Sequence, residues 1–246
     1  MNYIPLVIQA SIKNSFRMRS VVIISTGVIF ICVIGVAAIF VTQFISPEVN
    51  MATPDQSVLE NVFGLILFTT SFLSTGIFAS VNAFQSLTRE KSRGNIQALL
   101  ATPLSPVDIW LGKSLAYFLP GLVFGLVMTI AAFLALNFIY FAPEIGFLVT
   151  PWMLISNFVA VPLVFLALIL LMFEIGLVGK TATANIIAQI FLPVVMTLMI
   201  NLAMHNVVTA SSWLFTVTLV GLTIVIGITV FILRSRLTVE RIILSQ

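Results

Sequence analysis

The sequence predicts an all-α membrane protein built from six transmembrane helices. Of the 246 residues, 60% are hydrophobic and 8% are charged, and the mean hydropathy is +1.20. A soluble domain of ordinary composition carries roughly 25% charged residues, so a water-soluble core cannot bury this much apolar surface. Six stretches are long enough for a helix of about 20 residues to cross a bilayer core. No sustained polar–apolar alternation is present, which argues against a β-barrel.

The predicted spans divide the chain into six apolar stretches. They are approximately 21–44, 61–84, 114–140, 152–173, 186–204 and 213–233. The third stretch is long and contains Pro120, so a tilt or a kink is expected there. Residues 1–246 are therefore interpreted as a single transmembrane domain.

Residues 1–20 are expected to form an amphipathic helix at the membrane interface. Ile8 and Ile12 stand four residues apart on one row of such a helix, and Gln9 and Lys13 form the next row. The alternative is a basic flank that only sets the topology.

The positions of Lys and Arg predict the orientation of the six spans. All 11 cations lie before the first span, in the second and fourth connections, or after the last span: Lys13, Arg17, Arg19, Arg89, Lys91, Arg93, Lys113, Lys180, Arg234, Arg236 and Arg241. The other three connections hold Glu48, Asp55, Glu60 and Glu144 and no cation. Positive charges are retained on the cytoplasmic side, so both termini are expected in the cytoplasm, with the chain in the plasma or inner membrane. A cleaved signal peptide is not expected, because the first apolar run is too long.

No catalytic or metal-binding constellation is recognisable. His205 is the only histidine and Cys32 the only cysteine, so neither a zinc cluster nor an internal disulfide is expected. Residues 112–114 and 179–181 match the end of the phosphate-loop pattern G-x-x-x-x-G-K-[ST], but both lack its leading glycine. A nucleotide site is therefore not expected in this chain. The net charge of +3 is small and lies beside membrane segments, which does not suggest nucleic-acid binding.

The positions of the acidic residues indicate whether the chain could use an ion gradient to drive transport. None falls near the middle of a span, and Glu174 lies at the inner end of the fourth. Buried mid-membrane acids are typical of proton- or sodium-coupled carriers. If the chain moves a substrate uphill, the energy is therefore expected to come from elsewhere.

Polar residues inside the spans suggest either a pathway or helix contacts. In the fifth span they recur every four residues, at Asn185, Gln189, Pro193, Thr197 and Asn201. This spacing forms one ridge on a helix. The second span carries several hydroxyl residues, including Ser71 and Thr75, although small hydroxyl residues more often serve packing. Gly121 and Gly125 in the third span form a G-x-x-x-G pair that favours close helix approach.

A charged, helix-prone segment, residues 86–113, joins the second and third spans. It holds six of the 19 charged side chains (11 Lys and Arg, 8 Asp and Glu). Ile96, Leu99 and Leu100 place apolar groups on one face of a short helix, which Pro103 ends. Such a helix either lies among the lipid headgroups or inserts into a groove on another protein.

On these residues the chain resembles the type-2 ABC exporter permeases (ABC-2 type). In that family a Glu-Lys-containing stretch with a glycine, followed by a Leu-Leu-Ala-Thr-Pro element, joins the second and third spans. The corresponding residues are Arg89, Glu90, Lys91, Ser92, Arg93 and Gly94, then Leu99, Leu100, Ala101, Thr102 and Pro103. The motif match runs on to Pro120, and the topology match covers the whole chain. Members often have an acid after the glycine where this chain has Gln97, so a salt bridge made by that acid would be missing.

The resemblance implies a mechanism with partners. Two six-span subunits, identical or different, pair in the membrane, and two copies of a separate ABC ATPase subunit, which bind ATP and Mg, sit beneath them. Residues 89–102 would form the coupling helix. The residues expected to couple to the ATPase are Arg89, Glu90, Lys91, Arg93, Gly94, Gln97, Leu99, Leu100, Thr102 and Pro103.

The resemblance also implies a pathway between the paired subunits. Spans two and five face it in this family, which favours Ser71, Thr75, Asn185, Gln189, Thr197 and Asn201 as pathway-lining residues. The chain is thus expected to be a permease subunit without enzymatic activity or a cofactor of its own. The alternatives are a secondary carrier or channel, or a non-transporting subunit that only transmits force.

Overall fold

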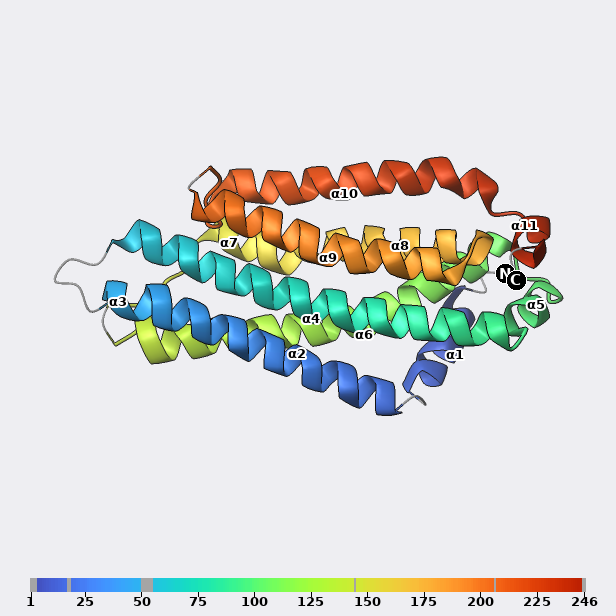
Figure 1. Ribbon diagram of the computed structural model, residues 1–246, viewed down its shortest axis with the longest axis horizontal. Helices are drawn as coiled ribbons and strands as arrows, with labels where there is room; N and C mark the ends of the chain where they lie inside the picture. The colour runs from blue at the N-terminus through green and yellow to red at the C-terminus, as the bar shows by residue number, and fades with distance from the viewer. Residues whose placement is uncertain (1–3, 17–18, 50–54, 144, 206, 245–246) are drawn as a thin grey trace.

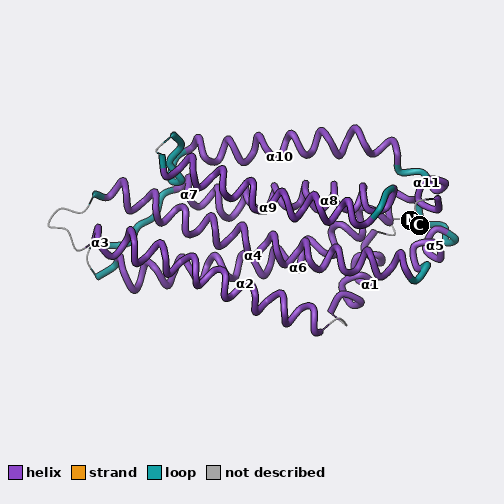
Figure 2. The backbone as a smooth tube through the Cα atoms, in the orientation of Figure 1, coloured by secondary structure: helices purple, strands orange, loops and turns teal. Residues whose placement is uncertain are grey.

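The computed structural model describes residues 4–16, 19–49, 55–143, 145–205 and 207–244. This part of the chain is all-α and contains no strand, and its long helices run roughly parallel to the long axis (Figures 1 and 2). Six helices are long and apolar enough to cross a membrane: Arg19–Val49, Gln56–Ser92, Pro106–Phe141, Pro151–Val178, Thr181–Met204 and Trp213–Leu233. The predicted six-span, multi-pass membrane protein is confirmed.

The elements follow one another without long connections. They are α1 (Ile4–Phe16), α2 (Arg19–Phe40), η1 (Val41–Ile45), α3 (Ser46–Val49), α4 (Gln56–Ser92), α5 (Asn95–Leu100), α6 (Pro106–Leu136), η2 (Asn137–Phe141), α7 (Pro151–Ile155), η3 (Ser156–Ala160), α8 (Val161–Val178), α9 (Thr181–Met204), α10 (Trp213–Leu233), η4 (Arg234–Arg236) and α11 (Val239–Leu244). The wide π turn η1 continues α2 and η2 continues α6, so the first and third spans extend beyond their predicted ends, whereas η3 lies inside the fourth span between α7 and α8.

Helix α4 lies at the centre of the bundle. In its apolar window 89% of the residues are buried, against 17% for α9 and 22% for α10. Two glycines of α6 allow the close contact with α4: a Cβ on Gly121 would lie 2.7 Å from the Cβ of Ala79, and a Cβ on Gly125 would overlap the Thr75 hydroxyl. The predicted close approach at the G-x-x-x-G pair is confirmed.

The first residues of α4 are fixed by side-chain hydrogen bonds. Asp55 caps the helix, accepting from Ser57 Oγ at 2.7 Å and from Ser57 N at 2.9 Å, and these bonds lower the pKa of its carboxyl. The buried Asn61 amide donates to the Ala203 carbonyl at 3.1 Å and accepts from Ala210 N at 2.7 Å. The connection between α9 and α10 is therefore held against α4.

Helix α1 packs against the first part of α6, at the same end of the molecule as α5 and α11 (Figure 1). Val7 is buried, and a Cβ on Gly112 would lie 2.7 Å from Val7 Cγ1. Ile8 and Ile12 are half-buried against the core while Lys13 is exposed. The predicted amphipathic character of this segment is confirmed for these residues.

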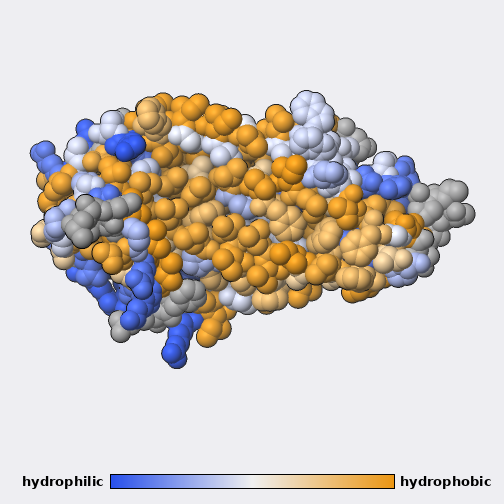
Figure 3. All heavy atoms as spheres, turned by 180° about the vertical axis from the view of Figure 1, so that it is seen from behind, coloured by the Kyte–Doolittle hydropathy of each residue, from blue (hydrophilic) through white to orange (hydrophobic). Residues whose placement is uncertain are grey.

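The surface is banded in the way a membrane protein requires. Hydrophobic residues cover its middle, and hydrophilic residues gather toward the end that carries α1 and α5 (Figure 3). The described cations lie at that end, because each connection that holds them joins spans there. Two residues of the predicted charge pattern, Arg17 and Glu144, lie outside the described residues.

Candidate functional site at the α1–α5 groove

The segment expected to form one coupling helix, residues 89–102, is divided in two. Helix α4 continues to Ser92, and α5 begins at Asn95. Between them Gly94 has φ of +69°, a left-handed conformation that glycine adopts with little strain. Its N–H donates to the Lys91 carbonyl at 3.0 Å. The expected short helix with Ile96, Leu99 and Leu100 is present as α5, but it does not extend back to Arg89 as one helix, because the left-handed Gly94 separates it from α4.

The segment ends where α6 begins. Ser105 is the N-cap residue, and its Oγ accepts from Asp108 N at 3.1 Å. The Asp108 carboxylate accepts in turn from Ser105 N at 3.3 Å, which completes a capping box, and Pro106 fills the first turn. Asp108 is therefore the third residue of α6 and closes the capping box at its start.

A groove with a volume of about 720 Å³ lies between α1 and α5. We call it the α1–α5 groove. One wall is formed by α1, with Leu6, Ala10 and Asn14. The other wall is formed by α5 and the turn that follows it, with Ala98, Leu99, Thr102 and Pro103. Glu90 and Lys113 also border the groove. Its walls are mostly apolar, with two buried charges among them.

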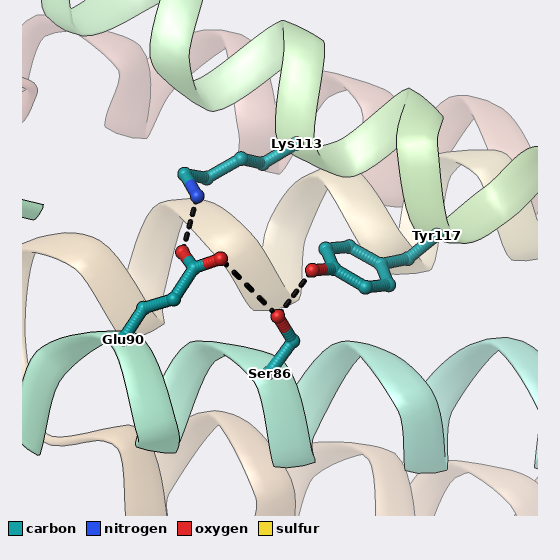
Figure 4. A network of polar contacts seen from close by, with 4 residues as sticks. All are labelled: Ser86, Glu90, Lys113 and Tyr117. Atoms are coloured by element: carbon teal, nitrogen blue, oxygen red, sulfur yellow. Dashed lines mark hydrogen bonds and ion pairs between the residues drawn. The ribbon is translucent and has the colours of Figure 1, made fainter. Parts of the chain in front are cut away.

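Glu90 and Lys113 belong to a polar cluster that joins α4 to α6 (Figure 4). Lys113 Nζ donates to Glu90 Oε2 in an ion pair, while Ser86 Oγ donates to Glu90 Oε1 at 3.3 Å. The Ser86 and Tyr117 hydroxyls are hydrogen-bonded to each other. All four residues are buried, with Glu90 5% and Lys113 2% exposed. Removing one partner of such a pair leaves an uncompensated buried charge, which costs about 3–5 kcal/mol.

Further contacts connect the same region to α8. The Tyr117 ring stacks on Phe173 with centroids 5.5 Å apart and planes 12° apart. Trp110 Nε1 donates to the Leu170 carbonyl at 2.9 Å, and Lys91 Nζ donates to the Gly179 carbonyl at 2.7 Å. The last turn of α4 and the first turns of α6 are thus held to α8 as well as to each other.

The ten expected coupling residues differ in exposure. Arg93, Gln97, Thr102 and Pro103 are exposed, Arg89, Lys91, Gly94, Leu99 and Leu100 are half-buried, and Glu90 is buried. The exposed ones surround the tip of α5, where a partner has access. Glu90 instead faces Lys113, so its position suits joining α4 to α6 rather than direct contact with a partner.

The two hydroxyl residues expected to line a pathway lie in helix contacts. Ser71 and Thr75 are each 1% exposed. Ser71 Oγ donates to the Asn157 carbonyl, within the wide turn η3, at 2.8 Å, and Thr75 faces Gly125 of α6. Both positions fit helix packing, the alternative given above for small hydroxyl residues.

The polar ridge of the fifth span is directed away from the bundle. Gln189, Pro193, Thr197 and Asn201 are exposed on α9 and Asn185 is half-buried, whereas Ala184, Ala188 and Ala203 on another face are buried. Asn201 Nδ2 donates to the Thr197 carbonyl at 2.8 Å, within the same helix. The ridge is therefore available on the surface of the single chain.

The two segments that partly match the phosphate-loop pattern, residues 112–114 and 179–181, contain residues with roles in packing and pairing. Gly112 gives room to α1, Lys113 pairs with Glu90, and Lys180 precedes the first turn of α9. Among the described residues, no three His, Cys, Asp or Glu side chains come together as metal ligands.

The comparisons give no relative: no protein-family model, no curated protein and no solved structure matches this chain. The functional argument therefore depends on the arrangement of the residues.

The sequence interpretation missed Ser86, Lys113 and Tyr117 as members of one cluster with Glu90. A signal was present: Lys113 directly precedes the third apolar stretch, and a lysine entering a buried helix needs a counter-ion. The preceding segment holds two acids, Glu90 and Asp108, and Asp108 is engaged in the capping box of α6, which leaves Glu90 at the end of the neighbouring span.

Proposed function

We propose that this chain is the permease subunit of an ABC-2 type transporter, an ATP-driven exporter of the plasma or inner membrane with both termini in the cytoplasm. The observation that supports this most is the α1–α5 groove. It lies at the cation-rich end of the bundle, and its buried Glu90–Lys113 ion pair joins two membrane spans. An apolar groove beside an exposed charged tip is a suitable receptor for a helix of a soluble partner.

The contacts around the groove provide a route for force. A partner helix pressing on α5 moves the end of α4 directly, because only Arg93 and Gly94 separate the two helices. The ion pair then carries the displacement to α6, and the Lys91–Gly179 and Trp110–Leu170 hydrogen bonds carry it to α8. Closure of an ATPase pair beneath the membrane would reorient the spans in this way.

The partners follow from the same proposal. Two copies of an ABC ATPase subunit supply ATP and Mg, and a second permease subunit, the same or different, covers the polar ridge of α9. Exposed amide side chains in a span are unfavourable against lipid, so a pathway or a partner helix is a better neighbour for Gln189 and Asn201 than acyl chains.

The decisive experiment is copurification followed by a transport assay. The tagged chain is purified from its native membrane, the bound proteins are identified by mass spectrometry, and the complex is reconstituted in vesicles with ATP. The proposal expects a soluble ATPase with a full phosphate loop, and movement of a substrate that depends on ATP. A carrier or channel would copurify without an ATPase, and a force-transmitting subunit would retain the ATPase without transport.

A charge placed in the groove tests the docking site. Ala98 is exposed and lines the groove, so Ala98→Asp, like Leu99→Asp, is expected to release the ATPase while the spans stay inserted. Ala182 is exposed in the first turn of α9, where Ala182→Asp is the matched control and should retain the ATPase. Equal retention by all three variants would show that the groove is not the docking site.

A further inference from the structure

A second groove opens between α2 and α6, on the lipid-facing side of the bundle. Its volume is about 570 Å³, within the range of roughly 300–1,000 Å³ usual for small-molecule sites. It is lined by Val22 and Thr26 of α2, Phe78 of α4, and Leu119, Val123 and Val127 of α6. Apart from Thr26, these side chains are apolar.

The groove exists because α2 diverges from the bundle. Ile29, Val33, Phe78 and Met128 form a buried cluster that holds α2 against α4 and α6. Toward its first residue α2 leans away from these helices (Figure 1). Val123 and Val127, 61% and 58% exposed, are left facing outward on α6. An apolar hollow of this kind within a membrane span is open to acyl chains.

Two cations stand at the α1 end of this groove. Arg19 precedes Val22 by three residues and Thr26 by seven, so it lies on the same face of α2, one turn closer to the membrane surface. Lys13 follows Ile12, which lines the groove, and lies on the neighbouring, exposed row of α1. Both cations are exposed, and neither forms an ion pair within the described part of the chain.

We infer that this groove retains an anionic phospholipid, with an acyl chain between α2 and α6 and the headgroup phosphate at Lys13 and Arg19. The inference needs only the membrane location of the chain and does not rest on the proposed transport function. A guanidinium and an ammonium above an apolar groove match the two parts of this lipid. A zwitterionic lipid offers the same chains without a net negative charge.

Native mass spectrometry of the detergent-purified chain tests the inference. It is incubated with phosphatidylglycerol or with phosphatidylcholine of identical acyl chains, and the lipid retained is measured. We expect preferential retention of phosphatidylglycerol and an affinity about fivefold lower for each of Lys13→Gln and Arg19→Gln. Arg241→Gln, an exposed cation on α11, is the control and should change nothing. Equal retention of the two lipids, or equal loss in all three variants, would overturn the inference.

Filling the groove tests the acyl-chain part separately. Val123→Trp is expected to abolish the selective retention of phosphatidylglycerol. Ile228→Trp, at an exposed position on α10, is the control and should leave that retention intact. If the Val123→Trp protein is not produced, Val127→Trp is used in its place. Unchanged retention in the groove-filling variant would place the lipid elsewhere. Glycerol phosphate, which has the headgroup charge and no chains, should not bind at comparable concentrations, and equivalent binding would also contradict the inference.

Discussion

Two buried carboxylates at the α1–α5 end have opposite surroundings. Glu90 is paired with Lys113 and accepts from Ser86, whereas Glu174, 2% exposed on α8, has no hydrogen-bond partner for either oxygen in the described structure. A buried carboxylate without a hydrogen-bond partner is destabilising even with a cation such as Arg234 in its neighbourhood, whereas a paired one becomes so only when its partner is removed. Equal substitutions at the two sites should therefore have effects of opposite sign.

Replacing each carboxylate by methionine measures this difference. Glu174→Met is expected to raise the free energy of unfolding by about 1–3 kcal/mol, because a desolvated polar group is removed. Glu90→Met is expected to lower it by about 3–5 kcal/mol, because Lys113 is left buried and unpaired. Both free energies of unfolding are to be measured by denaturation in detergent micelles. A loss of stability at Glu174 as large as that at Glu90 would contradict the view that Glu174 lacks a hydrogen-bond partner.

The ion pair itself is isolated by a double-mutant cycle. Lys113→Met alone should destabilise the protein about as much as Glu90→Met, and the double variant should recover most of the loss, since no charge then lacks a partner. Each variant is also assayed for the activity of the proposed ATPase partner in the copurified complex. If the double variant recovers its stability but its ATPase activity stays uncoupled from transport, the ion pair acts as a link between α4 and α6. Additive losses of stability would show that the two side chains do not interact.

At the scale of elements, the turn between α4 and α5 depends on one left-handed residue. A Cβ on Gly94 would meet only Gln97 Oε1, at 3.6 Å, so the cost of Gly94→Ala is backbone strain of about 1–2 kcal/mol rather than a clash. We expect this variant to reorient α5 and to reduce partner-coupled ATPase activity. Gly27→Ala, in the middle of α2 with no atom within 4 Å of the added Cβ, is the control and should stabilise by about 0.5–1 kcal/mol. Unchanged coupling at Gly94 would show that the turn is not needed for it.

The ridge on α9 is the other element whose surface has a functional prediction. Gln189→Leu and Asn201→Leu are expected to alter substrate-stimulated ATPase activity more than they alter the amount of protein in the membrane. Val194→Leu, at an exposed apolar position of the same helix, should change neither quantity. If the two leucine variants reduce only the amount of protein, the ridge serves helix packing between subunits.

At the scale of the whole molecule, composition and charge placement predicted the six spans but not their lateral arrangement. A continuous apolar run marks a span regardless of which helix lies in the centre, and α4, the most buried, is the one richest in hydroxyl residues. Those hydroxyls suggested a pathway, yet Ser71 and Thr75 serve close helix contacts. The Glu90–Lys113 pair was equally hidden, because it joins residues 23 positions apart across two helices. Spacing along one helix does not predict such a contact.

The length of α4 gives the last prediction. Its 37 residues, at about 1.5 Å each, span about 55 Å. This is well beyond a hydrocarbon core of about 30 Å, so the charged end of α4 should stand clear of the bilayer.

Single-cysteine labelling tests this placement. Cys32 is the only cysteine, and Cys32→Ser provides a cysteine-free background. Gln97→Cys, exposed on α5, should react with a membrane-impermeant maleimide only after cells are permeabilised, and Gln56→Cys, exposed at the other end of α4, should react in intact cells. Labelling of both from the same side would contradict the transmembrane placement of α4, and with it the proposed cytoplasmic position of the α1–α5 groove.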